Sequence, residues 1–396
     1  MPRILRILNR LNIGGPTYNV AYLSRYLDPH FQTRVLAGTR EPHEGNSDYI
    51  LNDLGVPFEY VPNMNRSINP RKDMQAYRYI YNTIRNEKPD IVHTHAAKAG
   101  VLGRLAAHRS PGRPRAIVHT YHGNVFDGYF SPVKTKVFLA IERYLCGIST
   151  AIVAISEHQK NDLVNKYKIA PASKVHVIKL GFDLHRFTDG QQEKRAAFRQ
   201  FYGLRDDEVA IVITGRLTAI KNHSLFIESV ALVKQEDPGL KIKVFIVGDG
   251  ELLDSIIALA RDRGLSVCAP HEDNYHADII FTSWWKDIDV INAGADIVAL
   301  TSLNEGTPVS IIEAQASETA VICTDVGGVK DVVTDGYNGL LCEGDAAAFA
   351  GKLKRLIVNA ELRNRIALNG KKSALENYSY ARLVAETENL YNYLLS

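Results

Sequence analysis

The chain has 396 residues, 45% of them hydrophobic, so it can bury at least one large core, and its length favours two domains over one. Its net charge is only +3, but residues 1–180 hold 25 Lys and Arg against 13 Asp and Glu, whereas residues 181–396 hold 22 against 31. The four cysteines have no CxxC spacing and no run approaches the ~18 apolar residues of a membrane-spanning helix, so we expect neither a disulfide framework, nor a zinc knuckle, nor an integral membrane protein.

Short apolar runs alternate with amphipathic, helix-like stretches along the first half of the chain. The runs are RILRILNRL, TRVLAG, DIVHTHAA, RAIVHTYHG, TAIVAIS and KVHVIKLG. Such alternation is typical of a parallel sheet wrapped by helices. We therefore expect a Rossmann-like α/β domain over residues 1–182.

The second half restarts the same pattern after a turn-like join near residues 180–187. Its runs are EVAIVITG, KIKVFIVGDG, DIIFTSW, DIVALTS, AVICTDVGG and GLLCEGD. A second doubly wound domain is expected over residues 183–377, facing the first across a cleft. Residues 378–396 are expected to form a C-terminal helix, and periodicity alone leaves open whether it crosses back to the first domain.

Two carboxylates follow the run DIVALTS, in the stretch TSLNEGTPVSIIEAQAS. Glu305 and Glu313 are eight residues apart, which on one helix would leave them about 80° out of alignment. The spacing favours a loop carboxylate and a helix carboxylate, with Thr307 as N-cap and Pro308 as the first helical residue. The N–H groups near this helix start would face a negative ligand. The alternative is an acidic residue that merely complements the helix dipole.

Basic and glycine-rich turns follow two other predicted strands. The stretch TGRLTAIKNH places Arg216 and Lys221 beyond the strand EVAIVITG, and a guanidinium with an ammonium suits a diphosphate. The stretch LNIGGPTYN places Gly14 and Gly15 before the first helix, where the backbone can approach a phosphate or sugar closely. A solvated basic loop and an ordinary turn are the respective alternatives.

Four histidines end the runs DIVHTH and AIVHTYH. His93 and His119 lie inside apolar runs and are expected to be core residues. His95 completes an HxH pair, but no carboxylate or cysteine lies at matching spacing, so no metal site is predicted. His122 precedes Gly123 and begins a loop, where its side chain can act as a hydrogen-bond donor or proton carrier.

Taken together, these stretches resemble the family 4 nucleotide-sugar-dependent glycosyltransferases, which have the GT-B fold of two Rossmann-like domains. NIGGPTYN, HTHAAKAGVLGRLAA, VHTYHGNVF, GRLTAIKNH, VGDGELL and TSLNEGTPVSIIEAQ follow the family's order over nearly the whole chain. The resemblance implies sugar transfer with retention of configuration, without a metal or other cofactor. It also implies no conventional general base.

The resemblance implies roles for individual residues. Glu313 matches the glutamate that holds the nucleotide's ribose, Glu305 the one near the donor sugar, and His122 a histidine that contacts that sugar. Arg216 and Lys221 match the diphosphate clamp, which makes them, with Glu305 and His122, the candidate catalytic residues.

The resemblance also implies a backbone cradle for the donor. Its members are Gly15, Gly306, Thr307 and Val309, with Pro308 in the same turn but without an N–H to offer. Ser283 stands where the family's base-binding turn often has glycine, so the turn does not distinguish uracil from guanine. We favour a UDP-sugar over a GDP-sugar as donor.

The resulting hypothesis is a cytoplasmic hexosyltransferase that acts on a glycan or lipid-linked acceptor in cell-surface polysaccharide synthesis. The basic first half would sit against an anionic membrane as a peripheral protein at its inner face. Nucleic acid is not expected as a partner, because no nucleic-acid-binding motif accompanies the charge. Two alternatives remain: a GT-B sugar-nucleotide epimerase, which would isomerise donor alone, and a catalytically silent nucleotide-sugar-binding protein.

Overall fold

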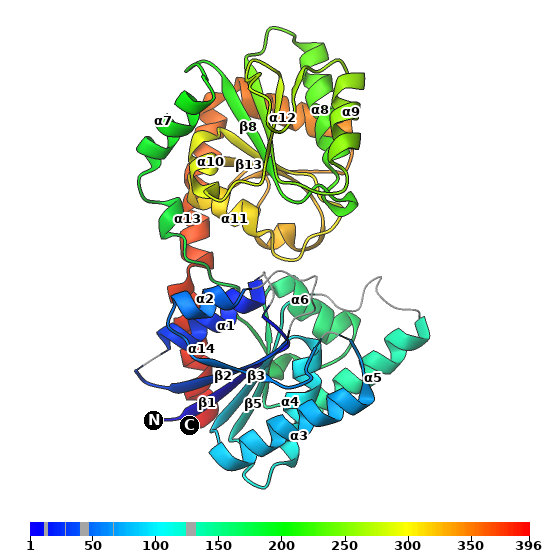
Figure 1. Cartoon of the computed structure of the whole chain (residues 1–396), viewed down its shortest axis with the longest axis vertical. Coiled ribbons are helices and arrows are strands. Elements are labelled where there is room, and N and C mark those ends of the chain that lie inside the picture. Colours follow the sequence, from blue (N-terminus) through cyan, green and yellow to red (C-terminus); the bar gives the residue numbers. More distant parts are fainter. Residues whose placement is uncertain (12–14, 28, 40–46, 66, 124–131) are drawn as a thin grey trace. The chain divides into compact units, whose positions relative to one another are not determined.

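A computed structural model describes residues 1–11, 15–27, 29–39, 47–65, 67–123 and 132–396. By contacts within the chain, these residues divide into two compact units, drawn in Figure 1. The first unit is Met1–Phe182 with Ser379–Ser396, and the second is Asp183–Tyr378. No helix in the described ranges is both long enough and apolar enough to cross a membrane.

The first unit is built on a parallel sheet with the strand order β3-β2-β1-β4-β5-β6-β7. Its strands are β1 (Arg3–Leu8), β2 (Gln32–Gly38), β3 (Phe58–Val61), β4 (Ile91–His95), β5 (Ala116–Tyr121), β6 (Ala151–Ala154) and β7 (Val175–Val177). Strands β4 and β5 are buried along their whole length, because helices cover both faces of the sheet. The covering helices are α1 (Gly15–Tyr26), α2 (Asp48–Asp53), α3 (Pro70–Glu87), α4 (Ala97–Arg109), α5 (Pro132–Ile148), α6 (Glu157–Asn161) and α14 (Tyr380–Leu395).

The last helix of the chain, α14, completes the core of this first unit. Leu383 and Tyr391 are buried in one cluster with residues of β1, α1 and β4. The ring of Tyr380 stacks on that of Tyr26, with centroids 4.5 Å apart. A Cβ on Gly181 would come within 2.8 Å of the Ser379 carbonyl oxygen, so the chain returns to this unit through a close backbone contact.

The second unit repeats the architecture with the order β10-β11-β9-β8-β12-β13-β14. Its strands are β8 (Val209–Thr214), β9 (Ile242–Val247), β10 (Val267–Cys268), β11 (Ile279–Ser283), β12 (Ile297–Leu300), β13 (Ala320–Thr324) and β14 (Leu340–Cys342). Its helices are α7 (Gln191–Phe201), α8 (His223–Glu236), α9 (Leu253–Asp262), α10 (Ile288–Gly294), α11 (Val309–Ala316), α12 (Ala346–Val358) and α13 (Ala360–Tyr378).

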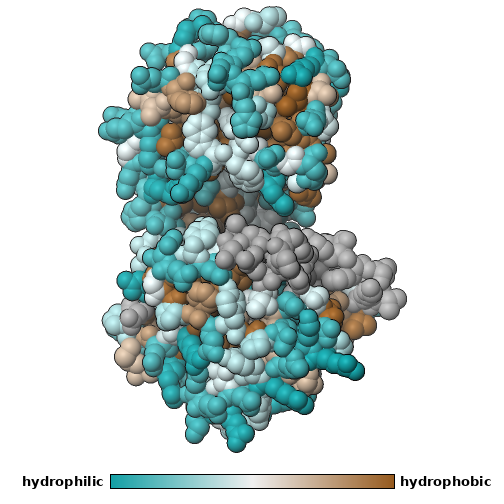
Figure 2. Space-filling view, in the orientation of Figure 1, coloured by the Kyte–Doolittle hydropathy of each residue, from teal (hydrophilic) through white to brown (hydrophobic). Residues whose placement is uncertain are grey.

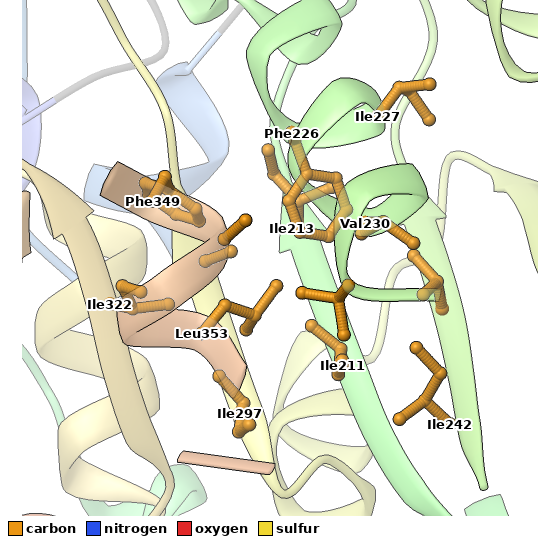
Figure 3. Packing of buried hydrophobic residues seen from close by; sticks show 14 of the residues in the cluster. Ile211, Ile213, Phe226, Ile227, Val230, Ile242, Ile297, Ile322, Phe349 and Leu353 are labelled. Atoms are coloured by element: carbon orange, nitrogen blue, oxygen red, sulfur yellow. The ribbon is translucent and has the colours of Figure 1, made fainter. Parts of the chain in front are cut away.

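Helices α8 and α12 cover one face of the second sheet. Phe226 of α8 and Phe349 and Leu353 of α12 point toward the β-branched side chains of the central strands, as Figure 3 shows. Ile213 and Ile322 in those strands are at most 2% exposed. At about 25 cal/mol per Å² of buried apolar surface, this layer is the main stabilising term of the unit.

The two sheets confirm the predicted pair of doubly wound α/β domains. The sequence analysis missed β3 and β10, and both are edge strands of their sheets. Strand β3 is only partly buried and β10 has two residues, so neither carries the continuous apolar run of a central strand.

Candidate functional site

The chain order of the strands reverses between β8 and β12 in the second sheet. These strands are hydrogen-bonded neighbours, although α8, β9, α9 and β11 separate them in the sequence. In open α/β sheets the crevice outside the carboxyl ends of two such strands binds ligands. The loop after β8 carries Arg216 and Lys221, and the loop after β12 carries Glu305, so the topology brings these residues to one edge.

Glu305 forms the centre of a polar contact between those two loops. Its Oε1 accepts a hydrogen bond from Lys221 Nζ at 2.6 Å and another from Ser302 Oγ at 2.6 Å. The side chain of Glu305 is 13% exposed and that of Lys221 29% exposed. Two donors on one oxygen fix the orientation of the carboxylate. Within the described ranges, Glu305 Oε2 has no protein partner.

Hydrogen bonds from buried hydroxyl groups hold the loop after β12 against the loop after β8 and against β13. Thr301 Oγ1 lies 3.1 Å from the Lys221 carbonyl oxygen and 3.0 Å from that of Asn222. Thr324 Oγ1, at the end of β13, donates to the Ser302 carbonyl oxygen at 2.7 Å. Because these hydroxyls are at most 1% exposed, their hydrogen bonds are not shared with water, and the loops are held rigidly.

A pair of glycines lets the turn after β13 pack directly on the Glu305 backbone. Gly327 has a φ of +48°, and a Cβ there would lie 2.2 Å from the Glu305 carbonyl oxygen. Gly328 donates its N–H to that oxygen at 2.9 Å, and a Cβ on it would lie 2.0 Å from the Gly306 oxygen. No other residue type fits this approach. The sequence analysis assigned these glycines no role, although the Gly-Gly after a strand was visible.

The loop that carries Arg216 is also held by a close glycine contact and a backbone hydrogen bond. A Cβ on Gly248, whose φ is +143°, would lie 2.0 Å from the Gly215 carbonyl oxygen. The N–H of Leu217 donates to the Asp249 carbonyl oxygen at 2.9 Å. Arg216 itself is exposed, and its guanidinium has no protein partner within the described ranges. The loop backbone is therefore fixed while the cation remains available for a ligand.

Helix α11 begins one residue later than expected. It spans Val309–Ala316, and Pro308, with a ψ of 88°, is its N-cap and not its first helical residue. Thr307 lies before the cap, so the expectation of a threonine N-cap is wrong. No side-chain hydrogen bond caps the helix, because proline has no side-chain acceptor. The first N–H groups of α11 thus have no partner inside the helix and lie next to the Glu305 loop.

Glu313 lies in the second turn of α11 and has a different environment from Glu305. Burial raises the pKa of its carboxyl to about 7; the Arg186 guanidinium lowers this pKa and the Asp289 carboxylate raises it. Arg186 is hydrogen-bonded to Asp289, and Lys194 Nζ lies 3.0 Å from the other oxygen of Asp289. The Glu313 carboxylate has no hydrogen bond among the described residues. A ligand that donates hydrogen bonds to this carboxylate would favour its ionised form.

Ser283 ends β11 in a conformation that normally belongs to glycine. Its φ is +60°, and its carbonyl oxygen accepts a hydrogen bond from the Gly248 N–H at 3.0 Å. A non-glycine residue in this region costs about 1 kcal/mol. The backbone therefore has the shape of the glycine turn even though the side chain is that of serine.

In the first unit, the loops after β1 and β5 carry the predicted residues. Gly15 is the first residue of α1, and a Cβ on it would meet only the Leu180 side chain, at 3.5 Å. Gly14 lies outside the described residues. His122 follows β5 directly, and its Nε2 lies 3.0 Å from Nδ1 of His95 at the end of β4.

His93 and His119 are buried and hydrogen-bonded, which confirms their interpretation as core residues. His93 lies 2.5 Å from Tyr391 Oη and 2.7 Å from Thr120 Oγ1, and His119 lies 2.9 Å from Thr94 Oγ1. The described residues contain no group of three His, Cys, Asp or Glu side chains that could hold a metal ion.

Burial lowers the pKa of His122 to about 3, so the imidazole is neutral near pH 7. A neutral ring argues for a hydrogen-bonding role and against a proton carrier at that pH. The contact of His122 with His95 could not be predicted from local sequence, because the two residues are 27 positions apart, one at the end of β4 and one just after β5.

Two family models match the chain, one for each half. Residues 13–186 match "Glycosyltransferase Family 4", and residues 194–373 match "Glycosyl transferases group 1". The chain is 28% identical over 352 residues to the Escherichia coli UDP-Gal:alpha-D-GlcNAc-diphosphoundecaprenol alpha-1,3-galactosyltransferase, covering 87% of this chain and 85% of that protein. It is 27% identical over 346 residues to the capsular polysaccharide biosynthesis glycosyltransferase CapM of Staphylococcus aureus, covering 85% of each.

Among solved structures, Anabaena HepE in complex with UDP is similar in fold. The two chains superpose with a TM-score of 0.81 at 19% sequence identity, over 98% of this chain and 99% of HepE. At this identity the similarity shows the fold alone.

Proposed function

Because this chain belongs to the family 4 glycosyltransferases, which have the GT-B fold, we propose that it transfers a hexose from a UDP-sugar to a glycan or lipid-linked acceptor. The pathway we propose is cell-surface polysaccharide synthesis. The Escherichia coli relative is named for a UDP-sugar donor and a diphosphoundecaprenol-linked acceptor, which supports both substrate classes. The HepE structure was solved in complex with UDP, which supports uracil as the base of the donor nucleotide.

The observation that carries this proposal is the arrangement around Glu305. Lys221, held on Glu305 at 2.6 Å, and the exposed Arg216 lie at the same sheet edge as the free N–H groups of α11. Two cations and a helix start stabilise the charge that develops on a leaving diphosphate. We propose that this set replaces a metal ion and that no other cofactor takes part.

The carboxylates are assigned to the two ends of the donor. Glu305 Oε2, which has no partner in the described part of the chain, would accept a hydrogen bond from a donor-sugar hydroxyl. Glu313 would accept hydrogen bonds from the ribose. The backbone of Gly306, Thr307 and Val309 would cradle the phosphates and sugar. We propose retention of configuration, with the leaving phosphate accepting the acceptor's proton; proton NMR of the product's anomeric centre tests this.

UDP and UDP-hexoses are expected to raise the melting temperature of the protein more than GDP and GDP-mannose do. A ligand that binds only the folded state stabilises it by about 2.7 kcal/mol at a free concentration of 100 Kd. Thermal unfolding is measured with each nucleotide at equal concentration, followed by assays of sugar transfer with the best donor. A larger shift with the guanine nucleotides would overturn the base assignment.

The proposed contact between Glu313 and the ribose is tested by measuring the UDP-dependent rise in melting temperature at several pH values, in the wild type and in Glu313→Gln. The pKa of Glu313 is raised to about 7, so its contribution to stability is fully present below about 4.5, its ordinary value, and is lost as pH rises through 7. The UDP-dependent shift should grow from pH 6 to pH 8 in the wild type, since the ionised carboxylate accepts ribose hydroxyls better. In Glu313→Gln this pH dependence should vanish.

We further propose that the protein works in the cytoplasm, attached to the inner face of the membrane through helix α5 of its basic first unit. Val137, Ile141 and Tyr144 are 40–55% exposed and are spaced by four and three residues, so they share one face of α5. We call these three residues the α5 stripe. Lys136 is exposed beside it. On the face drawn in Figure 2, other exposed hydrophobic residues lie in small groups between hydrophilic ones. An apolar stripe with a flanking cation suits an anionic lipid surface.

Replacing Val137, Ile141 and Tyr144 together by serine is expected to abolish co-sedimentation with vesicles rich in phosphatidylglycerol. Each buried apolar side chain contributes about 1.5–3 kcal/mol to such binding, so three should suffice to release the protein. The matched control is Leu368→Ser, which removes a side chain that is 56% exposed in the second unit. Failure of the wild type to sediment even at low salt would refute membrane attachment.

A further inference from the structure

His95 has no role in the proposed reaction, yet it touches a residue that does. Its side chain is completely buried at the carboxyl end of β4, and its Nδ1 lies 3.0 Å from Nε2 of His122. The two rings stack with centroids 5.2 Å apart and an interplanar angle of 27°. The remaining nitrogens, Nε2 of His95 and Nδ1 of His122, are both buried and have no hydrogen-bond partner among the residues that the structure describes.

Both rings are neutral near pH 7. Burial, followed by the charges of neighbouring histidines and Arg6, holds the pKa of His95 well below its ordinary value, and burial alone lowers that of His122. Each neutral imidazole carries one N–H, so in this hydrogen bond one ring donates and the other accepts. The direction of the bond decides which nitrogen of His122 is left for a ligand.

The two directions differ in where they leave an unpaired N–H. If His122 Nε2 donates, the N–H of His95 moves to its Nε2, where the side chain is 0% exposed and no partner is present. If His95 Nδ1 donates, the unpaired N–H is on Nδ1 of His122. That atom is also buried, but it belongs to a side chain that is partly exposed and lies just beyond the carboxyl end of β5. An unpaired buried N–H costs about 1–3 kcal/mol, so the molecule avoids leaving it where no ligand can reach it.

We propose that His95 is a positioning residue that donates its Nδ1–H to His122 and thereby holds His122 as the Nδ1–H tautomer. His122 then presents a neutral N–H donor to the ligand in place of a bare, basic nitrogen. Resting on the proposed function, this assigns the sugar contact of His122 to a donated hydrogen bond.

The His95 ring packs against His93, which is itself held by hydrogen bonds. The ring of His93 lies 4.2 Å from that of His95 between centroids. Arg6 Nη1 can only donate, and it lies 3.2 Å from His93 Nδ1 and 2.8 Å from Tyr391 Oη. His93 Nδ1 is therefore an acceptor, and its Nε2–H donates to Thr120 Oγ1 at 2.7 Å. Through Tyr391, helix α14 thus supports the histidine pair.

Imidazole ¹⁵N spectra of the histidine-labelled full chain test the proposal directly. His122 is assigned from the signals lost in His122→Gln, and its Nδ1 is expected to be protonated in the wild type. His95→Leu should abolish this single tautomer and lower kcat/KM about tenfold, the size of one hydrogen bond. His95→Asn, whose side-chain amide keeps a donor near the position of Nδ1, should retain the tautomer and most of the activity.

His119→Leu is the matched control. It removes another buried imidazole, 1% exposed, from the neighbouring strand without breaking the contact between His95 and His122. It should lower the melting temperature about as much as His95→Leu and leave the His122 spectrum unchanged. A wild-type His122 protonated on Nε2, or a tautomer that survives in His95→Leu, would overturn the proposal. If the proposed glycosyl transfer is wrong and the tautomer proposal is right, the wild type will show the predicted tautomer but will not transfer sugar.

Discussion

Glu305→Gln is expected to reduce sugar transfer by roughly 10³-fold or more while the protein remains folded. Glutamine keeps the shape of the side chain and can still accept from Ser302, but it removes the charge that pairs with Lys221 at 2.6 Å. Because that pair is partly exposed, its loss should change the free energy of unfolding by only about 1 kcal/mol. Initial rates with saturating donor, together with thermal unfolding, measure both effects.

Glu318→Gln is the control for this result. Glu318 lies just beyond α11 and pairs with Lys371 at 2.9 Å, and both side chains are at least 32% exposed. This variant loses an ion pair with the same chemistry at a distance from the β8 and β12 loops, so its turnover should equal that of the wild type. Undiminished turnover by purified Glu305→Gln would refute the role given to this carboxylate.

Lys221→Met is expected to lower kcat/KM by roughly 10²–10³-fold, about 3–4 kcal/mol of transition-state stabilisation. The substitution keeps the aliphatic stem and removes the ammonium, which both orients Glu305 and faces the proposed diphosphate. Since Lys221 and Glu305 act as one unit, the double variant Lys221→Met/Glu305→Gln should be only slightly worse than the more damaged single variant. A double-mutant cycle on kcat/KM measures this coupling.

Lys354→Met provides the comparison for the loss of a lysine. Lys354 pairs with Glu236 at 3.1 Å on the surface of the second unit, and its side chain is 32% exposed, close to the 29% of Lys221. Its removal should leave kcat/KM unchanged. If the effects of the Lys221 and Glu305 substitutions add fully, the two residues act independently, and the joint role proposed for them is wrong.

The central strands of both sheets could be predicted from the sequence, because each is a short apolar run buried on two faces. The carboxyl-edge position of Arg216, Lys221 and Glu305 followed from the same runs, since each residue lies in the loop after one of them. Hydrophobic patterns did not predict the strands at the solvent-exposed edges of the sheets. The edge strands β3 and β10 have too little buried surface to leave an apolar run.

The predicted start of helix α11 was also wrong. The residues Thr307 and Pro308 favour an N-terminus by composition, but the structure begins α11 at Val309 because Pro308 has a non-helical ψ of 88°. Tight packing of Gly328 against the Glu305 and Gly306 backbone accompanies this turn. Propensity describes an isolated segment and contains no term for such contacts.

The sequence by itself determined the two α/β domains and the strand ends that carry the candidate site residues, because hydrophobic periodicity and strand-end residues are local properties. The class of chemistry came from the resemblance of its motifs to the family 4 glycosyltransferases. Only the tertiary structure decided which side chains meet. The contact of His95 with His122 spans 27 residues, that of Lys221 with Glu305 spans 84, and that of Arg6 with Tyr391 spans 385. The first two contacts depend on strand order and the third on the return of α14 to the first unit, and both features are set by the packing of whole elements against one another.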